Sequence, residues 1–543
     1  MKRIYIISVT IVLYSVNLSA QKQLKAYSIK PKLIVGLVID QMRWDYLYRF
    51  KSLYGSGGFK RLLSEGFTCE NTLIPYVPTY TAPGHSCIYT GSIPAINGII
   101  GNNWYDKTLH KNIYCADDST VNTVGSSTKW GRMSPENLWT TTITDELRFS
   151  NNFKSRVIGI ALKDRASIFP AGHAANASYW YDDKAGNWIT SSYYMKELPL
   201  WLKQLNEKHF PDSAMTHDWN TLISADKYDQ SAGDDNAFEH SIDGEKTKMF
   251  PHKISEINKN KYEAFKYTPA SITYAFDLAK ATISNEKLGQ NNVADFLAIS
   301  ISTTDYIGHW FGPNSVELED TYLRLDKEIA GILDFLDKAE GKDNYVLFLT
   351  ADHGVAHIPA FLHEHKVPAG VFNEVNLTKE ISKMVEDKYH IKNAISIIEN
   401  YQVYLNDSII ETSGRVADIR RSVIDFLMQR SYIIHAFETE HIATSNLPEP
   451  IKKMMINGYN PKRSGDIQFT LKPAFFVGSE TGTTHGLWNP YDAHIPLVWY
   501  GWNIKHGIMH RETYMTDISP TLAAMLNIQV PNGNVGKVIE ELF

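Results

Sequence analysis

The sequence predicts an α/β protein with a doubly wound, mostly parallel sheet, helices on both faces of that sheet, and inserted cap regions. Two observations predict this fold. Short β-branched runs end abruptly in polar residues, and amphipathic helical stretches separate the runs. Strands that are apolar almost without a break are buried on both faces, which is typical of a parallel sheet between helices. In such sheets the ligand site lies beyond the carboxyl ends of the strands.

Four of the apolar runs deliver polar groups at their carboxyl ends. Residues 33–39 precede Asp40, 157–162 precede Lys163 and Arg165, 296–301 precede Asp305 and His309, and 345–349 precede Asp352 and His353. A single strand that ends in Asp is commonplace. Four strands that each end in carboxylate, imidazole or cationic side chains are not expected by chance. Residues 316–339 carry a helical apolar stripe, and 494–500 read as a further strand.

Two ranges look like insertions into the core of one domain that spans residues 21–543. Residues 175–268 are polar and rich in Tyr and Trp, with a hairpin turn expected between Asp182 and Gly186. Residues 360–477 contain helical patterns of their own, for example at 416–428. Both insertions are expected to build a cap over the active face.

The overall composition is that of an ordinary globular protein. Of the 543 residues, 43% are hydrophobic and 21% are charged, which excludes a disordered chain. The 54 basic and 60 acidic residues give a net charge of −6, and no long basic run stands out. Nucleic acid is therefore not expected as the main partner.

The first twenty residues predict a secretory signal peptide. Lys2 and Arg3 form a positive start, residues 4–16 are mostly apolar, and Leu18-Ser19-Ala20 resembles a small-residue cleavage site. No other stretch is long and apolar enough to span a bilayer. We expect a periplasmic or secreted monomer that starts near Gln21 and has no membrane anchor.

Three cysteines, Cys69, Cys87 and Cys115, do not form a metal-binding pattern. An oxidising compartment would allow one disulfide, for instance between Cys69 and Cys87. Buried free thiols explain the same residues equally well.

The segment PYVPTYTAPGHSCIYTG, residues 75–91, raises a question about Thr81. Pro75 and Pro78 exclude a helix interior, whereas the residues after Pro83 can form a helix with the proline in its first turn. Thr81 is then expected just upstream of the helix start, where backbone N–H groups attract anions. Taken alone, the residue is an ordinary N-cap; the alternative is a nucleophile aimed at a phosphate.

Six further side chains form a candidate metal site: Asp40, Asp305, His309, Asp352, His353 and His485. Asp305 and His309 are four residues apart, so one helical turn places both on one face. Three carboxylates and three imidazoles suit Zn²⁺, and argue against Ca²⁺. Six ligands are the right number for two neighbouring ions.

The motifs resemble those of the alkaline phosphatase superfamily, most closely the PafA-type periplasmic alkaline phosphatases. The resemblance rests on these segments, in this order: Thr81-Ala-Pro-Gly-His85, Gly101-Asn102-Asn103-Trp104, Lys163-Asp164-Arg165, Asp305-x-x-x-His309, Asp352-His353-Gly354 and Thr484-His485-Gly486. Sulfatases of the superfamily carry Cys or Ser at the nucleophile, so threonine points to phosphoryl transfer. Asn97 departs from the His that many relatives have, and we expect a structural role there.

The resemblance implies hydrolysis of phosphate monoesters through a phosphothreonine on Thr81 at a two-zinc site. It assigns Asp305, His309 and His485 to one zinc, and Asp40, Asp352 and His353, with Thr81, to the other. It also implies that Asn102, Lys163 and Arg165 bind the phosphoryl oxygens, and we expect the Ala82 N–H to help. Lys163 and Arg165 share one side if they continue the preceding strand. Thr79 is expected to be a turn residue, and His357 receives no role.

Two other functions are compatible with this core. A phosphodiesterase or nucleotide pyrophosphatase has the same fold, but generally lacks the Lys-x-Arg pair and uses an apolar groove for the second substituent. A non-catalytic binding protein would be expected to have lost ligands, whereas all six candidates and the nucleophile are present.

Overall fold

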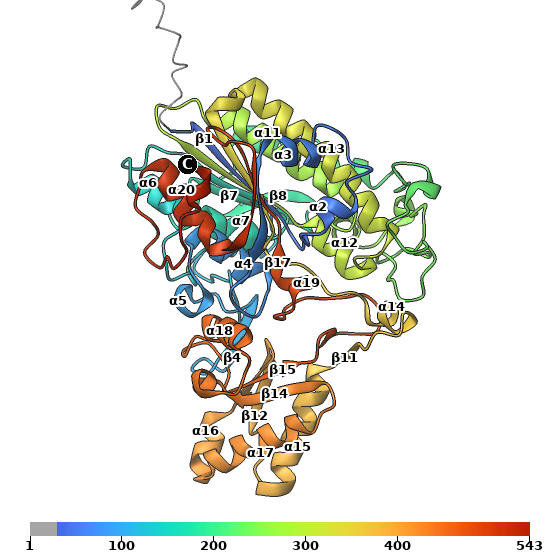
Figure 1. Cartoon of the computed structure of the whole chain (residues 1–543), viewed down its shortest axis with the longest axis vertical. Coiled ribbons are helices and arrows are strands. Elements are labelled where there is room, and N and C mark those ends of the chain that lie inside the picture. The colour runs from blue at the N-terminus through green and yellow to red at the C-terminus, as the bar shows by residue number, and fades with distance from the viewer. Residues whose placement is uncertain (1–29) are drawn as a thin grey trace, which may run out of the picture.

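The computed structural model describes residues 30–543, and the predicted signal peptide lies outside the described residues. Within this part of the chain an eleven-stranded mixed sheet forms the centre of the molecule (Figure 1), with strand order β17-β2-β18-β10-β1-β9-β6-β7-β8-β5 and β19 paired to β2. The strands are β1 Leu33–Ile39, β2 Phe67–Leu73, β5 Thr123–Val124, β6 Val157–Ala161, β7 Ala177–Asp182, β8 Asn187–Ser191, β9 Asp295–Ile301, β10 Tyr345–Thr350, β17 His494–Ile495, β18 Leu497–Gly501 and β19 Gly507–Tyr514.

The five strands at the centre, β10-β1-β9-β6-β7, are parallel. Leu33 of β1 pairs with Tyr345 on one side and with Asp295 on the other, so the strands start in step. Every residue of β1, β6, β9 and β10 is buried. Strands β18 and β8 run antiparallel on either side of this centre. The predicted mostly parallel sheet is therefore confirmed, and its four central carboxyl ends meet at one edge.

Helices cover both faces of the sheet (Figure 1). Helices α3 Phe59–Glu65, α11 Ala270–Glu286 and α13 Val316–Ala339 lie on one face, and α4 Thr81–Thr90, α6 Ile143–Phe149, α7 Asp164–Ala171 and α20 Ile518–Leu526 on the other. Helix α13 spans the predicted range, begins at the side-chain cap of Ser315 and buries Leu325, Ile329 and Leu333. The doubly wound fold thus follows from helices that bury apolar residues against both faces of the sheet.

The range expected as the first insertion, 175–268, begins inside the central sheet. Strands β7 and β8 form the hairpin predicted around Asp182 to Gly186, and both extend the sheet rather than cover it. The remaining residues form a layer of short helices and loops, with α8 Leu200–Asn206, α9 Phe210–Ala214 and α10 Lys261–Phe265. Trp188 of β8 stacks on Tyr274 of α11, with ring centroids 4.7 Å apart.

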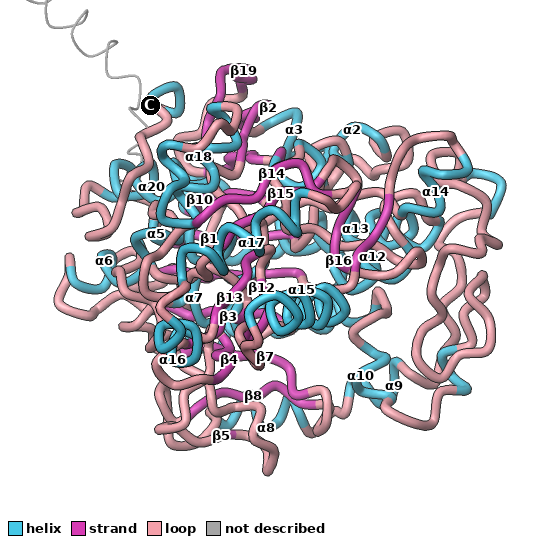
Figure 2. The backbone as a smooth tube through the Cα atoms, turned by 90° about the horizontal axis from the view of Figure 1, so that it is seen from below, coloured by secondary structure: helices cyan, strands magenta, loops and turns pink. Residues whose placement is uncertain are grey.

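The second inserted range, 360–477, builds a body with its own apolar core. A four-stranded antiparallel sheet has the order β12-β13-β15-β14, and α15 and α17 pack against its strands (Figure 2). These elements are β12 Ile395–Glu399, β13 Gln402–Leu405, β14 Ile433–Glu438, β15 Ile467–Leu471, α15 Glu374–Tyr389 and α17 Val416–Met428. Tyr80, next to Thr81, packs against this core, so the insertion reaches the predicted nucleophile.

Shorter elements connect the larger ones. They include α2 Tyr46–Arg49, α5 Pro94–Asn97, β3 Asn103–Asp106, β4 Lys111–Tyr114, α12 Thr303–Phe311, α14 Pro359–Glu364, β11 Gly370–Phe372, α16 Asp407–Ile410, α18 Glu449–Gly458, β16 Phe475–Val477 and α19 Pro490–Ala493. No helix among residues 30–543 is long and apolar enough to cross a bilayer. Cys69, Cys87 and Cys115 are buried free thiols, so the Cys69–Cys87 disulfide is not formed.

Candidate active site

The three carboxylates predicted as metal ligands come from three adjacent parallel strands. Asp40 directly follows β1, Asp305 lies four residues beyond the end of β9 in the first turn of α12, and Asp352 lies two residues beyond β10. Because β1 lies between β9 and β10, these side chains meet at the carboxyl edge of the sheet. All three are at most 3% exposed. The sequence therefore predicted this convergence correctly.

Asp40, Asp352 and His353 form one compact ligand group. The Nε2 atom of His353 lies 3.4 Å from Asp40 Oδ1 and 3.4 Å from Asp352 Oδ2. Those two carboxylate oxygens are fully buried and have no hydrogen-bond partner within the described chain. A buried carboxylate oxygen without a partner is costly unless a cation satisfies it, so the group fits a metal ion.

Asp305, His353 and His485 form a second compact ligand group, and His309, the other residue predicted there, lies beside Asp305. His309 Nε2 lies 3.1 Å and His485 Nε2 3.6 Å from Asp305 Oδ1. Asp305 and His309 share one face of α12, as the four-residue spacing predicted. The two groups adjoin each other, because the His353 and His485 rings stack with centroids 3.5 Å apart.

Backbone carbonyls fix the orientation of all three imidazoles. The Nδ1 atoms of His309, His353 and His485 lie 2.7, 3.0 and 2.7 Å from the carbonyl oxygens of Thr483, Gly354 and Thr79. A ring that donates Nδ1–H to a carbonyl presents an unprotonated Nε2, which is the form that binds a metal. Burial also lowers the pKa of His485 to about 4 and that of His353 well below its ordinary value.

Lys163 links the two ligand groups. Its Nζ donates to Asp40 Oδ2 at 2.7 Å and to Asp305 Oδ2 at 2.6 Å, and the side chain is almost fully buried. Burial opposes the lysine charge, but Asp305 and Asp40 outweigh it and raise the pKa of Lys163. Burial raises the pKa of Asp352 to about 7. The Lys163 ammonium therefore faces three carboxylates, and its single positive charge does not balance them. Bound cations could supply the remaining positive charge.

Thr81 is the first residue of α4, with Tyr80 as the N-cap, so the expectation that Thr81 precedes the helix was wrong by one residue. Pro83 still lies in the first turn. Thr81 Oγ1 is 3.4 Å from His353 Nε2 and 3.5 Å from Lys163 Nζ. Gly84 allows α4 to lie close to the Asp352 backbone, because a Cβ at residue 84 would lie only 2.5 Å from the Asp352 carbonyl oxygen.

Asn102 lies beside the start of α4 and corrects one expectation. Its Oδ1 accepts a hydrogen bond from the Ala82 N–H at 3.0 Å. The Ala82 N–H is therefore already bonded, and it is not a free donor for a phosphoryl oxygen in this arrangement. The same bond fixes the Asn102 amide so that Nδ2 is its remaining donor.

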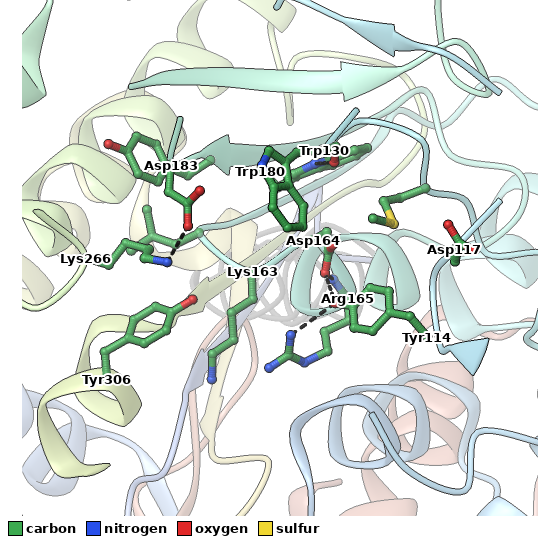
Figure 3. Close-up of a pocket in the computed structure, with 13 residues that line it drawn as sticks. Tyr114, Asp117, Trp130, Lys163, Asp164, Arg165, Trp180, Asp183, Lys266 and Tyr306 are labelled. Carbon is green, nitrogen blue, oxygen red and sulfur yellow. Dashed lines mark hydrogen bonds and ion pairs between the residues drawn. The ribbon is translucent and has the colours of Figure 1, made fainter. Parts of the chain in front are cut away.

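Lys163 and Arg165 do not continue a strand as expected. Strand β6 ends at Ala161, Lys163 is the N-cap of α7, and Arg165 lies in the first turn of that helix. Their side chains nevertheless extend into the same region (Figure 3). Arg165 Nη1 donates to the Tyr114 hydroxyl at 3.1 Å, and its buried Nε has no partner among residues 30–543. The two cations are brought together by a helix start, not by strand alternation.

Sequence reasoning missed two residues that hold the site together. Gln41, in the left-handed region at φ 66°, donates its backbone N–H to Asp352 Oδ1 and its side-chain amide to Asp305 Oδ1 at 2.8 Å. His85 bonds the Thr81 carbonyl and the Ser300 hydroxyl, each at 2.9 Å. Gln41 directly follows the candidate ligand Asp40, and His85 ends the Thr81-Ala-Pro-Gly-His85 segment. These positions were the available signal in the sequence.

Three residues given no catalytic role make structural contacts. The Thr79 hydroxyl donates to the Leu487 carbonyl at 3.0 Å. His357 contacts Arg43 and Asn314 and belongs to neither ligand group. Asn97 accepts the Ile99 N–H at 2.9 Å, a local turn bond that agrees with the structural role expected there.

Comparison with known proteins identifies the class to which this fold and site belong. Residues 34–501 match the family "Type I phosphodiesterase / nucleotide pyrophosphatase", and the chain belongs to that family. It is 48% identical to alkaline phosphatase PhoV of Synechococcus elongatus over 95% of this chain and 93% of the relative. It is also 50% identical to a Myroides odoratus protein named calcium-transporting ATPase, over 94% of each chain. The crystal structure of wild-type alkaline phosphatase PafA superposes with a TM-score of 0.93, at 46% identity over 94% of this chain and 99% of that one.

Proposed function

We propose that this protein hydrolyses phosphate monoesters through a phosphothreonine intermediate on Thr81 and releases inorganic phosphate. The observation that carries the proposal is the position of Thr81 Oγ1, 3.4 Å from His353 Nε2 and 3.5 Å from Lys163 Nζ. Around it lie five buried Asp and His side chains and the partly exposed His309. Close similarity to two alkaline phosphatases over nearly the whole chain supports it.

Two zinc ions are the proposed cofactors. Asp305, His309 and His485 would hold one, and Asp40, Asp352, His353 and Thr81 the other. Zinc at such ligands supplies Lewis acidity, which lowers the pKa of a hydroxyl and stabilises charge on phosphoryl oxygens. The lowered pKa values of His353 and His485, which favour neutral imidazoles, and the partnerless buried carboxylate oxygens fit that role.

The residues of the chain itself perform two displacements at phosphorus. Thr81 Oγ attacks the phosphorus, gives up its proton and forms the new P–O bond while the ester P–O bond breaks; the departing alkoxide takes up a proton. Water then attacks the phosphothreonine, and Thr81 regains its hydroxyl as phosphate leaves. Asn102, Lys163 and Arg165 bind the phosphoryl oxygens through both displacements, because fixed donors are most useful where charge accumulates.

A phosphodiesterase is the second candidate, and the family name favours it. Against it stand Lys163 and Arg165, since a monoester carries two negative charges and a diester only one. The deciding measurement compares kcat/KM of the zinc-loaded enzyme on an aryl phosphate and on its methyl diester. We expect the monoester to be preferred by orders of magnitude, and preference for the diester would refute the proposal.

We also propose that the protein is exported from the cytoplasm. The support is the sequence of residues 1–20, a charged start followed by an apolar run and a small-residue site. Mass spectrometry of the mature protein is expected to find a start near Gln21, and a mature protein that retains Met1 would contradict export by this route.

A further inference from the structure

A cavity of about 370 Å³ opens beside the proposed phosphoryl site (Figure 3). Lys163 and Arg165 line one end of it, and the other walls come from residues to which the proposed reaction assigns no role. Its volume lies within the range of small-molecule sites. The cavity is therefore a candidate for the part of the substrate that is not phosphate.

Lys163 borders both the cavity and the reacting centre. The Lys163 ammonium is 3.5 Å from Thr81 Oγ1 and lies 5.1 Å from the centre of the Tyr306 ring, which lines the cavity. Tyr306 follows Asp305, a residue of the second ligand group, on α12. A phosphoryl group held by Lys163 and Arg165 at Thr81 has this cavity as adjoining space for its ester substituent.

The walls of the cavity are rich in aromatic rings. Trp130 lines it and is 44% exposed, an unusual exposure for a large apolar ring. Trp180 is buried behind the same wall and donates its indole N–H to the Trp130 carbonyl at 3.0 Å, which ties the two segments together. Figure 3 shows Trp130 and Trp180 on the same side of the cavity. A flat ring of a ligand would meet an aromatic surface on this side of the cavity.

Polar groups occupy the wall beside Tyr306. Lys266 lies 5.2 Å from the centre of the Tyr306 ring and forms an ion pair with Asp183 at 2.5 Å. Burial opposes the charge of Lys266, but Tyr306 and Asp183 raise its pKa, so the ammonium stays charged. A flat ring that carries hydrogen-bonding atoms would find both an aromatic surface and polar partners in this cavity.

We propose that this cavity is a leaving-group subsite that binds the flat aromatic part of a phosphate ester, with Trp130 as its principal contact. The inference rests on the proposed phosphatase function and names its substrate class. Aryl phosphates and nucleoside monophosphates both fit, because each carries a phosphate monoester and a flat aromatic ring. Small aliphatic esters, such as glycerol phosphate, use the phosphoryl site alone.

The first experiment compares zinc-loaded wild type and Trp130→Ala on 1-naphthyl phosphate, adenosine 5′-monophosphate and glycerol phosphate. The ratio of kcat/KM between the two enzymes is taken for each substrate, so that differences in intrinsic reactivity between the esters cancel. We expect kcat/KM to fall about tenfold on the aromatic esters, the size of a lost ring contact, and less than twofold on glycerol phosphate. A larger loss on the nucleotide or on the naphthyl ester identifies which of the two sources the subsite prefers.

Two matched variants accompany Trp130→Ala. Trp130→Phe keeps a ring and is expected to retain most of the aromatic preference. Trp139→Ala removes an equally exposed tryptophan, 46% exposed, which contacts Arg463 and does not line the cavity, and it is expected to leave the preference unchanged. Equal losses of Trp130→Ala on all three substrates, or no loss on any, would overturn the proposal.

A binding measurement separates the subsite from the reaction. Calorimetric titration of 1-naphthyl phosphate into zinc-loaded Thr81→Ala should show binding that weakens about tenfold when Trp130→Ala is added. If wild type fails to hydrolyse the ester but this Trp130 dependence persists, the proposed function falls and the subsite stands. If the ester is hydrolysed and its binding is independent of Trp130, the subsite proposal falls alone.

Discussion

The residues of the site are positioned largely by backbone atoms and by short-range bonds. Carbonyl oxygens orient the three imidazoles, and the Ala82 N–H orients Asn102. The residue types and their order along the chain predicted that the six candidate ligands would lie close together. They did not predict Gln41 or His85, because neither a Gln–Asp bond nor a His–carbonyl bond leaves a pattern in one sequence.

Thr81→Ala removes the proposed nucleophile and retains all six Asp and His ligands. We expect kcat to fall by roughly 10⁴-fold or more, while metal content stays at the wild-type level. Thr79→Ala is the matched control: it loses one hydroxyl bond to Leu487, which costs about 1 kcal/mol of stability, and should stay active. Radiolabelled phosphate trapped at low pH should map to Thr81, and recovery of the label on another residue would reject the assignment.

The double change Lys163→Ala, Arg165→Ala tests why monoesters should be preferred. Each charge-assisted donor in such a site contributes on the order of 3 kcal/mol, about a hundredfold in rate. The loss in kcat/KM should be much greater for an aryl phosphate than for its methyl diester, which offers less charge. Arg511→Ala removes a surface guanidinium paired with Glu541 and serves as the control. Equal losses on both substrates would disprove this role for the pair.

Whole elements were predicted best where one local signal determined them. Helices α13 and α17 have the predicted bounds, since an apolar stripe defines each of them. The prediction was wrong at transitions: Lys163 and Arg165 start a helix, and α4 begins one residue early. Periodicity cannot distinguish the last residue of a strand from the cap of the next helix, because only tertiary contacts decide that boundary.

His252 joins the layer that follows β8 to the start of α13. Its ring lies 3.0 Å from Glu245 and 3.1 Å from Glu317, and all three side chains are buried. Burial opposes the imidazolium charge, but the two glutamates outweigh it and raise the pKa of His252 to about 9. Because the folded-state pKa lies above the ordinary 6.5, the stabilisation is complete below pH 6.5 and is lost as the pH rises through 9.

Replacing His252 should therefore matter most at low pH. We expect His252→Gln to lower the free energy of unfolding by on the order of 3 kcal/mol at pH 6, and by progressively less toward pH 10. Thermal unfolding of both proteins at pH 6, 7, 8, 9 and 10 measures this difference. His217→Gln, a change at an exposed histidine, should show no such trend. A difference that stays constant across the range would show that the ion pairs do not carry the effect.

At the scale of the whole molecule, the order of the strands in the central sheet brings the residues of the site together. Four neighbouring parallel strands end at one edge, α4 approaches that edge from one face of the sheet, and the loop after β16 brings His485 to it from the 360–477 insertion side. The sequence predicted that the strand ends would converge, since parallel strands share a carboxyl edge. It did not predict that β7 and β8 would extend the sheet, because their alternating aromatic residues suit an insertion equally well.

Metal removal should affect stability and activity together, because the same buried carboxylates serve both. Asp40, Asp305 and Asp352 converge around one lysine, and Asp40 Oδ1 and Asp352 Oδ2 have no hydrogen-bond partner in residues 30–543. Without a metal, Lys163 offsets only part of their mutual repulsion. A ligand present at a thousand times its Kd stabilises the folded state by about 4 kcal/mol, so Tm of a chain of this length should fall by roughly 4 °C for each ion lost on chelation.

Metal analysis of the purified enzyme should find about two zinc ions per chain. Activity should disappear on exhaustive chelation and return with zinc, and Tm should recover with it. Asp305→Asn weakens only one ligand group, so about one ion should remain and Tm should lie between those of the zinc-loaded and chelated enzymes. An exposed change, Asp343→Asn, should alter neither quantity. Full activity after chelation, or a single ion in the wild type, would exclude the two-zinc site and with it the metal-activated Thr81.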